Sequence, residues 1–145
     1  MAQPSPQNLQ NHARYVPLYH FVLFPIVLAL LGWSGKRMAS HFSTDALFGF
    51  LLVVAVTLAA FHARSFALTA QDRVIRLEMR LRMQTLAPQL MTRFDELTPG
   101  QFTALRFASD GELQGLAQQV LDGQLTKSSD IKKQIRNWKA DDLRV

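Results

Sequence analysis

The strongest constraint on this chain is a long apolar segment that runs directly into a basic amphipathic one, from Ala46 to Leu86. The first part is apolar over a membrane-spanning length, and its first ionisable side chains are His62 and Arg64. Neither Gly nor Pro separates the two parts, so no residue with poor helix propensity ends the helix there. The sequence therefore predicts one long helix that leaves a membrane near His62 and Arg64.

A second apolar segment, residues 16–33, contains 18 residues and no charge other than a possible one on His20. A helix of that length reaches about 27 Å, close to the thickness of a hydrocarbon core. Two buried helices of a soluble protein are disfavoured because so little amphipathic sequence remains to cover them. A signal peptide is disfavoured because largely polar residues precede the segment and no clean cleavage site follows it. We therefore expect two membrane spans.

The positive charge is concentrated after the second apolar segment, although the net charge of the whole chain is only +5. Basic residues flank membrane spans on the cytoplasmic side, and the loop between the spans carries only Lys36 and Arg37. Both termini are therefore expected in the cytoplasm, and residues 83–145 are too balanced in charge to suggest nucleic-acid binding. The arginines after the second segment are Arg64, Arg73, Arg76, Arg80 and Arg82.

Small and large apolar residues recur along the long helix at helical spacing. Four alanines repeat every four residues, which lets another helix approach closely within a bilayer. This partner is expected to be the first span, with a second protein as the alternative. Beyond the membrane the pattern gives two apolar stripes, which imply two packing partners. The alanine ladder is Ala55, Ala59, Ala63 and Ala67; one stripe is Val74, Leu77 and Leu81, and the other is Ile75, Met79 and Met83.

The last third of the chain contains short helical patterns and no strand signal. Pro88 ends the long helix. Thr98 and Ser109 each have Gln or Glu three residues later, which is the spacing of a capping box, and Gly123 marks a helix end. The expected fold is all-α: a polar tail (1–14), two transmembrane helices (15–34 and 46–69) that form a hairpin around a short external loop (35–45), a basic amphipathic extension (70–87) and a small cytoplasmic helical domain (88–145).

No constellation of residues predicts catalysis. The chain has no cysteine, which excludes disulfides and thiolate chemistry, and it has no phosphate-binding loop or paired-histidine zinc motif. His20 and His62 fall at the same membrane depth of the expected hairpin, so they are candidate haem or redox ligands. Structural packing of the two histidines is the favoured interpretation, and no cofactor is expected.

Several short segments along the chain together carry a resemblance: residues 14–17, 20–21, 66–68, 71–78, 95–101, 105–110, 131–133 and 137–138. Through them the chain resembles an uncharacterised family of small two-helix bacterial membrane proteins. The resemblance covers nearly the whole chain and implies this architecture and a bacterial inner membrane, without an established activity or site.

The expected function is that of a non-enzymatic inner-membrane protein that acts through protein interaction, as an accessory or assembly subunit of a larger complex. The alternative is a self-associating module that binds anionic lipid through Arg64, Arg73, Arg76 and Arg80. A haem or redox carrier using His20 and His62 is the remote alternative.

Overall fold

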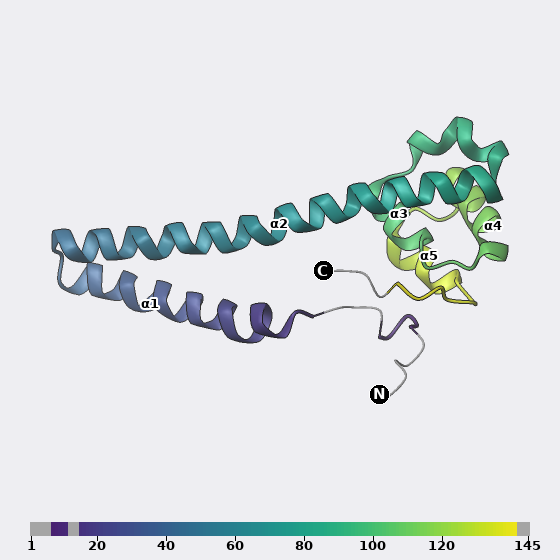
Figure 1. The fold of residues 1–145 in the computed structure, drawn as a ribbon. Coiled ribbons are helices and arrows are strands. Elements are labelled where there is room, and N and C mark those ends of the chain that lie inside the picture. Colours follow the sequence, from purple (N-terminus) through teal and green to yellow (C-terminus); the bar gives the residue numbers. More distant parts are fainter. Residues whose placement is uncertain (1–6, 12–14, 142–145) are drawn as a thin grey trace. The chain divides into compact units, whose positions relative to one another are not determined.

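The computed structural model describes residues 7–11 and 15–141, and all regular elements within these ranges are helices (Figure 1). This confirms the all-α prediction for the described residues. Most of the expected tail, residues 1–6 and 12–14, and the last residues, 142–145, lie outside them. The chain divides into two compact units, one formed by residues 15–68 and the other mainly by residues 69–141.

The first unit begins with a π-helical turn, η1 (Leu18–Leu23), followed by α1 (Phe24–Ser40). Pro25 explains the change, because proline has no N–H to donate and its ring clashes with the carbonyl four residues earlier. The preceding turn is wider, and the N–H of Phe24 donates to the carbonyl of Tyr19, five residues back. A local π-helical turn thus precedes Pro25.

The first helix ends later than the sequence suggested. It continues through Gly32 and Gly35 to Ser40, so the connection to the next helix is residues 41–43 and not 35–45. Gly32 and Gly35 lie inside this helix, since a glycine costs a helix only about 1 kcal/mol and does not by itself end it. A Cβ atom at Gly35 would lie 3.5 Å from the Phe50 ring, an ordinary van der Waals distance. Ser43 Oγ then accepts a hydrogen bond from the N–H of Ala46 at 3.1 Å, which is the hydrogen bond of a helix N-cap.

The second helix, α2 (Thr44–Leu86), is a single α-helix of 43 residues, which confirms the prediction of one unbroken helix. The first part of α2 lies beside α1 (Figure 1), where the Tyr19 hydroxyl donates to the carbonyl of Ala60 at 3.2 Å. Val27 and Ser34 of α1 and Ala46 of α2 are buried in this unit.

The alanine ladder does not take part in this packing. Ala55, Ala59, Ala63 and Ala67 are all exposed, so the favoured assignment of the ladder to the first span is wrong. Most half-buried residues of α2 in this unit follow a different line, with spacings of three and four residues, and they face α1. Those on this line are Phe50, Val53, Thr57, Ala60 and Arg64; Leu47, Val54 and Ser65 are half-buried beside it.

Two helical stretches, Leu18–Ser40 and Thr44–Leu86, are long and apolar enough to cross a membrane. In both, large apolar side chains are mostly exposed, including Leu28, Leu52 and Leu58. Exposed apolar surface of this extent is unfavourable in water. A hydrocarbon environment would remove this cost.

The second unit is a small helical domain built on the last part of α2. Four short helices follow: η2 (Pro88–Glu96), which is a 3₁₀-helix, α3 (Pro99–Leu105), α4 (Asp110–Leu121) and α5 (Ser128–Gln134). Apolar side chains from all five elements form one core. Its largest fully buried members are Phe94, Phe102, Phe107, Met79, Met83, Leu105, Leu113 and Ile131.

The helix ends of this domain agree only partly with the sequence. Thr98 and Gln101 form the expected capping box, with Thr98 N–H donating to Gln101 Oε1 at 2.8 Å, and Gly123 has the positive φ of 76° that ends α4. Ser109 makes no side-chain cap. Glu112 instead accepts a hydrogen bond from the backbone N–H of Asn137 at 3.1 Å. It therefore holds the C-terminal segment against α4.

Candidate interaction surface

The two apolar stripes of α2 have different environments. Ile75, Met79 and Met83 are at most 4% exposed and belong to the core of the helical domain. Val74, Leu77 and Leu81 are 54–59% exposed. We call the first set the inner stripe and the second the outer stripe. The sequence predicted both stripes but not which of them packs within the chain. In the structure the inner stripe packs within the chain, and the outer stripe has no such cover.

Arg82 of α2 forms hydrogen bonds with the segment that joins α3 to α4, next to the inner stripe. Its side chain is only 13% exposed. Nε donates to Asp110 Oδ1 at 2.8 Å, and two further nitrogens donate to the carbonyls of Arg106 and Ala108 at 3.2 and 2.5 Å. Glu78 stands four residues before Arg82 on α2, which is the spacing of a local ion pair. Tertiary contacts override that local pairing because three acceptors converge on one guanidinium.

The arginines proposed for lipid headgroups have contacts within the protein. Arg76 donates to Asp95 at 2.7 Å and lies 5.8 Å from the centroid of the Phe102 ring, and Arg80 lies 5.6 Å from that of Phe94. These guanidinium groups cover the edge of the aromatic core through cation–π contacts. Arg73, Arg76, Arg80 and Leu77 also line a shallow hollow of about 250 Å³. In the other unit, Arg64 lies 6.0 Å from the Tyr19 ring.

The structure gives each of the two histidines separate local partners. His20 Nδ1 lies 3.1 Å from the backbone nitrogen of Val16 and 3.0 Å from its oxygen. His62 is exposed, and its ring stacks on Phe66 with a centroid distance of 5.5 Å. No hydrogen bond or ring contact joins the two histidines in residues 15–141. Among the described residues no group of three His, Asp or Glu side chains could hold a metal ion.

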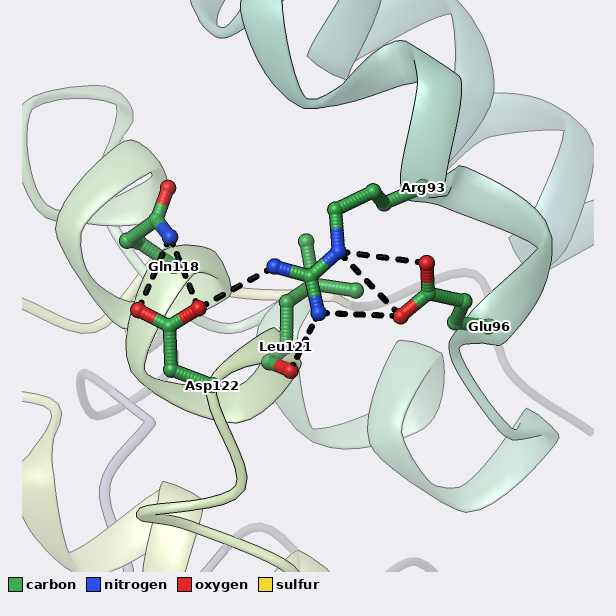
Figure 2. Close-up of polar contacts among 5 residues, drawn as sticks. All are labelled: Arg93, Glu96, Gln118, Leu121 and Asp122. Carbon is green, nitrogen blue, oxygen red and sulfur yellow. Dashed lines mark hydrogen bonds and ion pairs between the residues drawn. The ribbon is translucent and has the colours of Figure 1, made fainter.

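Sequence reasoning missed a polar cluster that ties η2 to the end of α4 (Figure 2). Arg93 donates to Glu96 Oε2 at 3.0 Å, to Asp122 Oδ1 at 3.0 Å and to the carbonyl of Leu121 at 2.6 Å. The Gln118 amide also donates to both carboxylate oxygens of Asp122. The spacing of Arg93 and Glu96 signals only a local pair. The contacts across about thirty residues depend on the folded domain.

Hydrogen bonds donated to their carboxylates lower the pKa values of two aspartates in this domain. The Gln118 amide, followed by the Arg93 guanidinium, holds the pKa of Asp122 below its usual range. Arg82 does the same for Asp110. The Glu96 and Asp122 carboxylates in turn raise the pKa of Arg93. These shifts identify ion pairs that stabilise the domain, and the groups are too exposed and too well paired to suggest catalysis.

We expect the helical domain to lose stability as the solution becomes acidic. The unfolded chain binds protons to Asp110 and Asp122 at a higher pH than the folded chain does, because the folded pKa values are lowered. Their contribution is therefore complete above the usual aspartate range and is lost as the pH falls through the folded pKa values. Urea unfolding measured between about pH 6 and about pH 3 should show this decline. In Asp122→Asn the unfolding free energy should fall less over this pH range. An equal fall in the variant and the wild-type protein would contradict a stabilising role of Asp122.

Comparison with known proteins places the chain in an uncharacterised group. A sequence-family model described as "Family of unknown function (DUF6526)" matches residues 1–145. No curated protein and no solved structure matches the chain. The description of the matching family names no activity, ligand or partner. A functional proposal must therefore rest on the geometry of α2 and the helical domain.

Proposed function

The chain belongs to this family of unknown function, DUF6526, and we propose that it is a non-enzymatic integral membrane protein that acts by binding another protein. The observation that supports the proposal is the outer stripe. Val74, Leu77 and Leu81 are more than half exposed on a helix whose other apolar stripe is almost completely buried. Apolar surface kept on a well-packed element is typical of an interaction site. An accessory or assembly subunit of a larger membrane complex would use it in this way.

We propose that the two apolar helices form a transmembrane hairpin in a bacterial inner membrane with both termini in the cytoplasm. The contact of Tyr19 with Ala60 and the approach of Phe50 to Gly35 are those of two antiparallel neighbours. The arginines that follow the second span support the orientation, because basic residues near spans remain on the cytoplasmic side. The exposed apolar side chains of both helices are more favourably placed in lipid than in water, which supports insertion.

The test is the molecular mass of the protein after mild detergent extraction from its own membrane. We expect an assembly larger than the monomer, measured by light scattering with the detergent contribution subtracted. Leu77→Asp should reduce the assembly to the monomer, because it places a charge within the outer stripe. Thr92→Asp, at another exposed site of the same unit, is the matched control. A wild-type monomer with no associated protein would contradict the proposal.

A second candidate function, binding of anionic lipid, is favoured by the hollow between Arg73, Arg76 and Arg80. Three guanidinium groups around one hollow favour an anion. We expect Arg73→Glu with Arg80→Glu to abolish preferential binding to anionic over neutral vesicles, measured by co-flotation of the reconstituted protein. Arg136→Glu, a basic residue outside the hollow, should leave the preference unchanged. Equal binding of the wild-type protein to both kinds of vesicle would exclude this function.

A further inference from the structure

We infer that the partner on the outer stripe is a second copy of this chain, packed in parallel along α2. The inference rests on the proposed function, because it names the occupant of the same surface. It depends on three features of α2: the register of the stripe, two charges beside it, and the small residues that continue its period.

The outer stripe has the register of a coiled-coil seam. Val74, Leu77 and Leu81 are separated by three and four residues, which places them at successive a, d and a positions of a heptad. The preceding d position is Ala70, which is also exposed. Of the two a positions Val74 is β-branched, and with Leu77 at d it matches the pattern that favours pairing of two helices over larger bundles. The register therefore fits one further α-helix of the same type.

The charges beside the stripe complement each other between two copies. Arg73 precedes Val74 at a g position, and Glu78 follows Leu77 at an e position. Both side chains are exposed, and neither forms an ion pair with another described residue. In a parallel pair of helices, g of one helix faces the e position five residues later in the other. Arg73 of each copy would thus meet Glu78 of the other.

The same charges disfavour the antiparallel arrangement. There, g faces g and e faces e, so that Arg73 and Arg80 of one helix would meet the arginines of the other. Like charges at these positions are unfavourable. Two copies inserted in one membrane also share one orientation, because the same basic residues set it. Parallel pairing is thus the arrangement that both the charges and the membrane allow.

Small residues continue the seam backwards along α2. Ala67 and Ala63 occupy the preceding a and d positions, and both are exposed. Within lipid, where no hydrophobic effect draws helices together, small residues allow close approach and strengthen packing. Ala63 and Ala67, the two ladder residues at seam positions, would then contact Ala63 and Ala67 of the second copy.

The absence of cysteine in the chain allows a direct test. Leu77→Cys places one thiol at the centre of the seam, and Asp72→Cys places one at an exposed position about 140° away around the helix. After oxidation in membranes, we expect Leu77→Cys to shift from the 16.4 kDa monomer band to a band of twice that mass. Asp72→Cys should remain at the monomer position. Mass spectrometry of the shifted band should identify a disulfide that joins the thiols introduced at position 77 of two copies.

The charge pair is tested in the same assay. Glu78→Arg in the Leu77→Cys background should lose the dimer band, and the further change Arg73→Glu should restore it. Loss without restoration would contradict the pairing of Arg73 with Glu78. A large assembly in detergent whose Leu77→Cys form gives no dimer band would overturn the inference and leave the proposed function standing. A monomer in both assays would overturn both.

Discussion

Replacing both Leu51 and Leu58 by arginine is expected to prevent insertion of the second span. Each leucine is at least half exposed, and each change to arginine near the centre of a span costs about 3 kcal/mol. The twelve Leu, Val and Phe residues of segment 46–69 favour insertion by about 6 kcal/mol in total, at roughly 0.5 kcal/mol each. Two arginines therefore cancel the driving force, whereas one does not.

The side of the membrane on which the C-terminus lies shows whether the second span has inserted. A C-terminal phosphatase that is active only outside the cytoplasm should be inactive on the wild-type protein and on Leu58→Arg, and active on the double variant. Leu77→Arg with Leu81→Arg adds the same charges to α2 beyond the span, and should leave the phosphatase inactive. Activity on the wild-type protein would contradict the proposed hairpin and its orientation.

Replacing Met83 by alanine is expected to destabilise the helical domain by about 3 kcal/mol, within the usual range for truncating a buried Met, Leu or Ile. Met83 has no exposed surface and lies in the core with the aromatic residues of η2 and α3. The measurement is urea unfolding in detergent, followed by Trp138 fluorescence. Trp33→Phe removes the only other tryptophan, and the Trp138 ring lies 5.1 Å from that of Phe107 in the domain.

Leu77→Ala provides the matched comparison on the same helix. Leu77 is 59% exposed, so its truncation should change the unfolding free energy by no more than about 0.5 kcal/mol when excess detergent separates the copies. Equal destabilisation by the two changes would show that both stripes pack within one chain. That result would remove the surface on which the proposed function depends.

The sequence predicted the features that depend on local periodicity. The continuity of α2 follows from the lack of Gly or Pro between Gly49 and Pro88, and the structure has one helix from Thr44 to Leu86. The two apolar stripes in the last part of α2 follow from the 3.6-residue period. The capping box at Thr98 is equally local, since its two hydrogen bonds join residues three positions apart.

The features that depend on tertiary contacts could not be predicted. The external loop was expected to begin at residue 35, because Gly35 has a low helix propensity, whereas α1 continues to Ser40. The alanine ladder was assigned to α1, because spacing identifies a stripe without identifying its partner. The spacing of Glu78 and Arg82 is that of a local pair, whereas acceptors of Arg106, Ala108 and Asp110 surround the Arg82 guanidinium in the folded domain.

The composition of the domain core has a consequence for biosynthesis. Met79 and Met83 are made well before Ile131 and Ile135, which complete the same buried cluster. At about 5–20 residues per second, roughly 2–10 s pass between the synthesis of Met83 and that of Ile131. During that interval the inner stripe lacks part of its cover within the chain.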